Sequence, residues 1–276
     1  MTRNAEESVV NGFGEEWTKF DQRELTGEEF EQLFNAYFRI FPWHLLPGSA
    51  VGFDLGCGSG RWARGVVSRV GTLHCIDASP KALEVARRNL AHEPGVRFHL
   101  ASVDEIPLPD GSMDFGYCLG VLHHVPDTMG GLCAAAAKLK RGAPFLVYFY
   151  YAFDNQPSWF RLLHRVTESI RWLLSRCPFW IRYLSTQVIA AMVYWPLARS
   201  ARFLERTGIA VQSFPLSFYR NRSFYTMRTD ALDRFGTRLE KRYTQAEIHQ
   251  MMELSGLTDI VFSDRPPFWC AVGIRR

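Results

Sequence analysis

The chain has 276 residues, of which 47% are hydrophobic, and a formal net charge of +4. This is enough apolar material for one large α/β domain with an addition, and it excludes a wholly disordered chain. From the polar N-terminus we expect no signal peptide, and the longest apolar run, 188–198, is shorter than the about 20 residues of a membrane span. Six cysteines without zinc-like spacing indicate a reducing, cytoplasmic setting and no metal site.

Strands and helices are predicted to alternate over the first half of the chain. Thr26 and Glu29 have the spacing of a capping box, and Ser79 followed by Pro80 is typical of a helix start. Apolar runs predict strands at 50–55, 72–76, 96–100, 113–119 and 143–151, with helices at 26–40, 61–70, 79–92 and 126–140. This alternation predicts parallel strands joined by crossover helices.

The pattern changes at about residue 152. Helical spacing over 157–176 and 179–207, the second kinked near Pro196, is followed by a helix at 244–255 and strands at 259–263 and 268–274. We expect a seven-stranded, mostly parallel α/β sheet. The expected organisation is an N-terminal helical segment over the cofactor cleft (1–44), a Rossmann-like core (45–151), a helical aromatic and Arg-rich cap (152–235), and a closing helix with the last two strands (236–276).

A glycine-rich loop, Asp54-Leu-Gly56-Cys57-Gly58-Ser-Gly60, follows the first predicted strand. Glycines at alternate positions allow close approach of the backbone to a ligand, and Gly58 to Ala63 also fits a relaxed dinucleotide pattern. A dinucleotide places its pyrophosphate at this turn, where the Asp54 carboxylate would repel it. S-adenosylmethionine (SAM) has no phosphate, and its ammonium and sulfonium suit an acid.

A second acid, Asp77, ends the next predicted strand, 21 residues after Gly56. An acid at this position can accept hydrogen bonds from both ribose hydroxyls of an adenosine. NAD and SAM sites share this feature, so an NAD(P)-dependent oxidoreductase remains the alternative. No Tyr has a Lys four residues later, so the usual short-chain reductase pair is missing.

The chain resembles the SAM-dependent methyltransferases of the ubiquinone/menaquinone-methylase-like group (methyltransferase type 11). The residues that carry the resemblance are 54–60, 77–79, 106–114 and 122–126. The resemblance implies a class I Rossmann-like fold and an enzyme that converts SAM to S-adenosylhomocysteine. It also implies which residues contact each part of the cofactor: Gly56, Cys57, Gly58 and Gly60 around the methionine part, Asp77 and Ala78 at the ribose, Ser102 and Val103 at the adenine, and Leu119 and Gly120 near the amine.

Two features of the resemblance need comment. Relatives usually carry Asp where this chain has Ser102, whose hydroxyl makes a weaker bond to the adenine amine. The segment from Phe13 to Trp17 is similar to one that folds over the cofactor in some relatives. A non-catalytic SAM-binding protein is a further alternative, although apart from Ser102 the cofactor motif is intact.

Candidate catalytic residues follow the fourth and fifth predicted strands. His123 or His124 could act as a base if the acceptor must lose a proton. At most one of the tyrosines 148, 150 and 151 should face the pocket, because neighbours in a strand alternate faces. Asp127 and Asp154 are weak candidates for metal ligands, and we predict that there is no metal site.

Residues 151–230 contain sixteen aromatic residues, eleven Arg, no Lys and four acids. Three interpretations compete: a plain helical cap with its arginines toward water, a pocket for a small or lipid-like acceptor with an anionic group, and peripheral attachment to an anionic membrane surface. No nucleic-acid recognition motif appears, and no obligate protein partner is inferred. We expect methyl transfer to oxygen first and to carbon next.

Overall fold

The computed structural model describes residues 4–154, 158–211 and 214–276. The chain divides into two compact units. Unit 1 comprises residues 1–22, 31–152 and 239–276, and unit 2 comprises residues 23–30 and 153–238. Residues 23–30 thus group with the expected cap rather than with the rest of the N-terminal segment.

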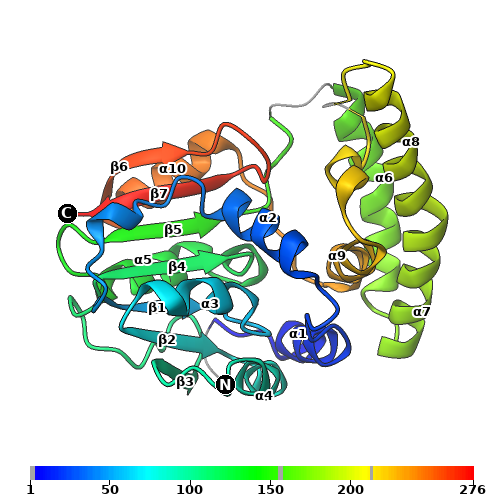
Figure 1. Cartoon of the computed structure of the whole chain (residues 1–276). Helices are drawn as coiled ribbons and strands as arrows, with labels where there is room; N and C mark the ends of the chain where they lie inside the picture. Colours follow the sequence, from blue (N-terminus) through cyan, green and yellow to red (C-terminus); the bar gives the residue numbers. More distant parts are fainter. Residues whose placement is uncertain (1–3, 155–157, 212–213) are drawn as a thin grey trace. The chain divides into compact units, whose positions relative to one another are not determined.

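Unit 1 is built on one sheet of seven strands in the order β3-β2-β1-β4-β5-β7-β6 (Figure 1). The strands are β1 (Val51–Leu55), β2 (Thr72–Asp77), β3 (Val96–Leu100), β4 (Phe115–Leu119), β5 (Pro144–Tyr148), β6 (Leu257–Phe262) and β7 (Cys270–Arg275). β7 is antiparallel to both of its neighbours, and the other pairs are parallel. The predicted seven-stranded, mostly parallel sheet is therefore confirmed.

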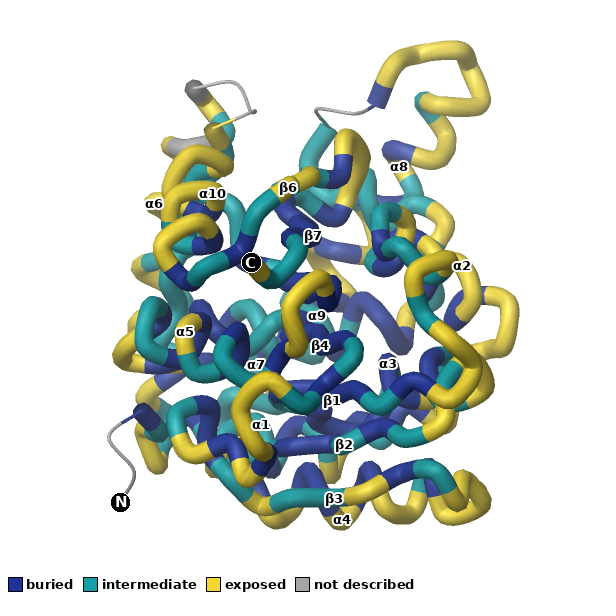
Figure 2. The backbone as a smooth tube through the Cα atoms, turned by 90° about the vertical axis from the view of Figure 1, so that its left-hand side faces the viewer, coloured by how far each residue is buried: buried dark blue, intermediate teal, exposed yellow. Residues whose placement is uncertain are grey.

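Helices cover both faces of this sheet, with α5 and α10 on one face and α3 on the other (Figures 1 and 2). The helices with residues in unit 1 are α1 (Glu7–Lys19), α2 (Gly27–Tyr37), α3 (Arg61–Val66), α4 (Pro80–Asn89), α5 (Thr128–Lys138) and α10 (Gln245–Leu254). Phe53, Phe145 and Val147 lie in the core and are fully buried. β1 and β4 are correspondingly dark blue through most of their length in Figure 2.

The fifth strand is shorter than its apolar run predicted. β5 ends at Tyr148 rather than at residue 151, because its partner β7 begins opposite, at Cys270. The helix predicted from residue 126 begins at Thr128, because the Asp127 side chain accepts a hydrogen bond from the Gly130 amide at 2.8 Å and caps α5. Asp127 therefore has a structural role at a helix start.

Unit 2 is helical. Its elements are α6 (Ser158–Leu174), α7 (Phe179–Ile189), a π-helical turn (Ala190–Tyr194), α8 (Trp195–Arg206) and α9 (Phe224–Gly236). The predicted kink near Pro196 is this π turn, which ends where the proline enters the first turn of α8. A small core of its own joins the π turn and α8 to α9: Ala190, Tyr194, Ala198, Met227, Ala231 and Phe235. α9 has no counterpart among the predicted elements.

The two predicted capping boxes have different outcomes. Thr244 and Glu247 form the complete reciprocal box at α10. At α2, Thr26 accepts from the Glu29 amide at 3.2 Å, but the Glu29 carboxylate accepts from the Ser223 amide and the Thr226 hydroxyl, both at 2.9 Å. Glu29 is thus diverted to the start of α9, a contact between residues about two hundred positions apart.

Candidate cofactor and active site

The candidate site lies where the parallel strands of unit 1 end. β1 is paired with β2 on one side and β4 on the other, so the strand order reverses direction beside it. The crevice at such a switch point, beyond the carboxyl ends of the strands, is where open α/β sheets bind ligands. Leu55, Asp77 and Leu119 end these three strands.

The glycine loop has the left-handed backbone that glycine allows. φ is +78° at Gly56, +54° at Gly58 and +76° at Gly60. A Cβ on Gly56 would lie 2.2 Å from Val121 Cγ2, so only glycine fits there. Most of the loop amides are used within the fold, because Gly56 and Cys57 both donate to the Ile76 carbonyl, at 2.7 and 3.0 Å.

Two further amides of the glycine loop also donate hydrogen bonds within the fold. Gly58 donates to Asp77 Oδ2 at 2.9 Å and Gly60 donates to the Cys57 carbonyl at 2.8 Å. Because these amides already have partners within the fold, they are not free to receive the cofactor's carboxylate. A cation follows directly in Arg61, whose guanidinium carbon lies 4.3 Å from the centre of the Trp62 ring. Arg61 Nε is buried and has no partner among the described residues.

Asp54 is buried in the sheet beneath this loop, with 1% exposure. Its Oδ2 has no hydrogen-bond partner in the part of the chain that the structure describes. Burial raises the pKa of Asp54 to about 8, the nearby Tyr117 hydroxyl opposes this increase, and Asp77 adds to it. A carboxylate in this position is suited to a positively charged ligand, which would favour its ionised form.

Asp77 holds two turns together at the end of β2. Its Oδ2 accepts from Gly58 and its Oδ1 accepts from the Ser79 amide at 2.8 Å. Burial raises the pKa of Asp77, and these two amide bonds oppose the increase. Each oxygen keeps a lone pair, so the carboxylate can still accept from the two hydroxyls of a ribose. Ala78, next to it, is half-buried.

The segment after β3 contains an acid that sequence reasoning did not assign. The buried Ser102 hydroxyl donates to Asp104 Oδ1 in a short hydrogen bond. Val103 between them is buried in the unit 1 core. The Asp104 carboxylate is therefore held beside the Ser102 hydroxyl. The only sequence signal for this was an acid close to Ser102.

Helix α1 lies against the same loops. A Cβ on Gly58 would lie 2.8 Å from Trp17 Nε1, and one on Gly14 would lie 2.5 Å from Ser79 Oγ. Further along, the Phe13 ring meets the His124 ring edge-on, with 5.0 Å between the ring centres. α1 thus contacts the glycine loop, the turn after Asp77 and the histidine pair.

His123 is completely buried after β4, and neither of its ring nitrogens has a hydrogen-bond partner among the described residues. Burial lowers the pKa of His123 well below its usual value, with His124 and Arg242 adding to the effect. The neutral form of the imidazole is therefore favoured, and its protonated form needs a nearby ligand group to stabilise it.

Two tyrosines pack beside His123. The Tyr150 ring stacks on it at 4.0 Å between centres, and the Tyr148 ring meets it at 6.3 Å. The expectation that at most one tyrosine would face the site assumed strand alternation, which ends at Tyr148. His124, in contrast, is fixed by the fold, because its Nδ1 lies 2.6 Å from the Leu239 carbonyl.

This architecture defines the class I SAM-dependent methyltransferases: the sheet order, the antiparallel seventh strand, and a glycine loop between an acid in β1 and an acid ending β2. The residues present fit the cofactor. Unpaired Asp54 Oδ2 matches an ammonium, and Asp77 matches ribose hydroxyls.

Comparisons with known proteins agree. Residues 53–147 match the family model described as a methyltransferase domain. The chain is 29% identical over 181 residues to a ubiquinone biosynthesis O-methyltransferase from Xanthomonas campestris, covering 59% of this chain and 74% of that protein. It is 28% identical over 183 residues to a protein of the same name from Xanthomonas axonopodis, covering 60% and 75%.

A solved structure shares the fold. Phosphoethanolamine N-methyltransferase 2 from Haemonchus contortus, in complex with phosphomonomethylethanolamine and S-adenosylhomocysteine, aligns with a TM-score of 0.52 at 15% identity, covering 94% of this chain and 44% of that one. The chain is a SAM-dependent methyltransferase with the class I fold, which decides against the oxidoreductase alternative.

Proposed function

We propose that this methyltransferase acts on a hydroxyl oxygen of a lipophilic acceptor that carries an anionic group. The names of the two Xanthomonas relatives support an oxygen acceptor. The lipophilic and anionic character is supported by the composition of residues 151–230, which contain sixteen aromatic residues and eleven arginines but no lysine. Peripheral contact with an anionic membrane surface would bring the enzyme to such an acceptor.

The cofactor roles are divided among charged groups at the strand ends. In this proposal Asp54 faces the ammonium of SAM, Arg61 its carboxylate and Asp77 its ribose. Ser102 and Asp104 together accept from the adenine amine, while Gly56 to Gly60 and the carbonyl of Leu119 border the methionine part. Helix α1, with Trp17, closes over the cleft and excludes water. Bound SAM supplies an electrophilic methyl group.

His123 is the proposed base, and its burial without partners is the observation that carries the proposal. A buried polar group that lacks a hydrogen bond destabilises a fold by about 1–3 kcal/mol. Both ring nitrogens of His123 are in this state. An acceptor hydroxyl would complete one of these hydrogen bonds, and the neutral imidazole would take its proton as the oxygen attacks.

The test uses three acceptors that differ in their reacting atom: an ortho-diphenol with a long alkyl chain and a carboxylate, the corresponding amine, and a 1,3-diketone. Mass spectrometry should show methylation of the phenol oxygen. His123→Asn should lower kcat about 100-fold and leave the affinity for S-adenosylhomocysteine unchanged. His92→Gln, at an exposed histidine, is the matched control.

Two results would overturn the proposal. Methylation of the amine or the diketone but not of the phenol would exclude an oxygen acceptor. Unchanged kcat in His123→Asn, with its pH profile equal to that of the wild type, would exclude His123 as the base.

A further inference from the structure

Helix α6 of unit 2 carries its apolar face on the outside. Large apolar side chains recur every three or four residues and therefore lie on one side of the helix. All of them are exposed, by 42–64%: Trp159, Leu162, Leu163, Val166, Ile170 and Leu173. A helix that packs in a water-soluble domain usually directs such a stripe toward the core.

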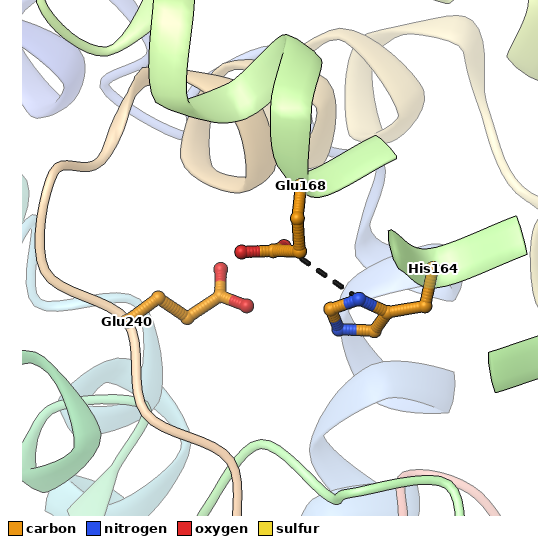
Figure 3. Close-up of side chains that lie close together, drawn as sticks. All are labelled: His164, Glu168 and Glu240. Carbon is orange, nitrogen blue, oxygen red and sulfur yellow. Dashed lines mark ion pairs between the residues drawn. The ribbon is translucent and has the colours of Figure 1, made fainter. Parts of the chain in front are cut away.

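The other face of α6 holds charged groups within unit 2. Glu168 Oε2 accepts from Arg171 Nη2 at 2.7 Å, and Glu168 Oε1 accepts from Arg234 Nη2 at 2.7 Å. The two arginine side chains are only 12% and 16% exposed. Figure 3 shows Glu168 next to His164 on the same helix, at 3.7 Å. The third residue in that view, Glu240, belongs to unit 1 and pairs with Arg242 at 2.7 Å. The ion-paired side chains of α6 thus lie on its packed side, and its large apolar side chains lie on its exposed side.

A second exposed stripe follows α7, the π turn and α8. Its members are again spaced mostly by three or four residues and are 48–71% exposed: Trp180, Leu184, Val188, Met192, Trp195 and Phe203, the last eight residues after Trp195. The same helices are short of acids. Residues 158–211 contain eight arginines and two acids, Glu168 and Glu205, and both acids are paired with arginines.

Cations therefore remain unneutralised beside the two stripes. Arg165, Arg202 and Arg206 are exposed and have no acidic partner among the described residues. Arg176 lies over the Trp172 ring, at 4.3 Å, and both are exposed. Exposed tryptophans and leucines flanked by arginines are the composition that binds in the plane of an anionic lipid surface.

We propose that the two stripes, with the arginines beside them, form a surface that docks on an anionic lipid bilayer. No helix in the described ranges is long and apolar enough to cross a membrane, so docking would be in the plane of the interface. A second copy of this chain is a poorer partner for this surface, because an isologous contact would bring two sets of unpaired arginines together. The inference deepens the proposed function, on which its biological purpose rests.

Vesicle binding tests the inference without any acceptor, so it can fail separately from the proposed function. The full chain is mixed with vesicles of phosphatidylglycerol and phosphatidylcholine (1:1) or of phosphatidylcholine alone, and bound protein is measured by flotation. Binding should require the anionic lipid, weaken at high salt and shift tryptophan emission to shorter wavelengths.

Matched variants locate the surface. Leu162→Glu with Leu173→Glu should weaken binding by at least about tenfold, because two leucines no longer enter the interface. Leu45→Glu with Leu254→Glu is the control, since these leucines are 51% and 69% exposed in unit 1. Arg165→Gln with Arg202→Gln should weaken binding several-fold and reduce its salt dependence. Thermal stabilisation by S-adenosylhomocysteine verifies that each variant is folded.

Three results would overturn the inference. The wild type could fail to float with anionic vesicles, or both leucine pairs could have the same effect. Light scattering could instead reveal a dimer that Leu162→Glu with Leu173→Glu dissociates, without vesicle binding, which would assign the surface to self-association.

Discussion

Unit 1 and unit 2 each contain a carboxylate with a strongly shifted pKa, and the shifts have opposite signs. Asp54 in unit 1 is buried, its Oδ2 has no hydrogen-bond partner in the described ranges, and burial raises its pKa to about 8. For Glu168 in unit 2 burial acts in the same direction but is outweighed by Arg171 and Arg234, which together lower its pKa to about 2. The presence or absence of a neighbouring positive charge therefore determines whether the pKa of a buried carboxyl group falls or rises.

The difference separates a ligand site from a structural contact. An unpaired buried carboxylate destabilises the free protein and makes sense where a ligand supplies the missing charge. A carboxylate held by two arginines is already complete. The apolar residues show a parallel contrast: unit 1 buries Phe53 and Phe145 completely, whereas α6 in unit 2 exposes its leucines.

Asp77→Ala should have the largest effect and would sharpen the contrast, because it removes a ligand-binding acid from unit 1. We expect the affinity for S-adenosylhomocysteine to fall at least about 100-fold, since two hydroxyl bonds to a charged group are worth roughly 3 kcal/mol. Isothermal titration calorimetry measures this. Glu205→Ala, which removes an exposed acid of unit 2, is the control. An affinity equal to that of the wild type would show that Asp77 serves only the turns.

Asp54→Asn tests the raised pKa. Because the folded pKa of Asp54 lies above its usual 3.8, the stability of the ligand-free protein should decrease as pH rises from about 4 to 8. A cationic ligand favours the ionised acid, so wild-type affinity for S-adenosylhomocysteine should increase about tenfold between pH 6 and pH 7, where the ligand's ammonium remains charged. Asn should abolish this increase in calorimetric titrations. A variant that keeps it would assign the titration to another group.

Glu168→Gln should have the smallest effect. The lowered pKa means that the Glu168 ion pairs stabilise unit 2 above about pH 4.5 and that this stability is lost as pH falls toward 2. Because the carboxylate is partly exposed, we expect a loss of only about 1 kcal/mol at pH 7. Urea unfolding followed by tryptophan fluorescence measures it. Glu205→Gln is the control and should not change the stability measurably. If Glu168→Gln destabilised the protein as much at pH 3 as at pH 7, the contrast between the units would be wrong.

Local patterns in the sequence were sufficient for most of unit 1. Apolar runs identified all seven strands, and the strand β3 was located residue for residue at 96–100. The positions of Asp54, Asp77 and the glycines followed from their places at strand ends. These features are legible because a buried strand and a tight turn each restrict which residues can occupy them locally.

Only the tertiary structure decided the features that depend on distant residues. Periodicity identified an apolar stripe on 157–176 but not that it faces water, because Glu168 on the other side of the helix is paired with Arg234, 66 residues later. In the same way, the packing of loops around the sheet pairs Ser102 with Asp104 and leaves the ring nitrogens of His123 without a partner among the described residues. A sequence pattern defines the face of a helix, whereas long-range contacts determine what that face meets.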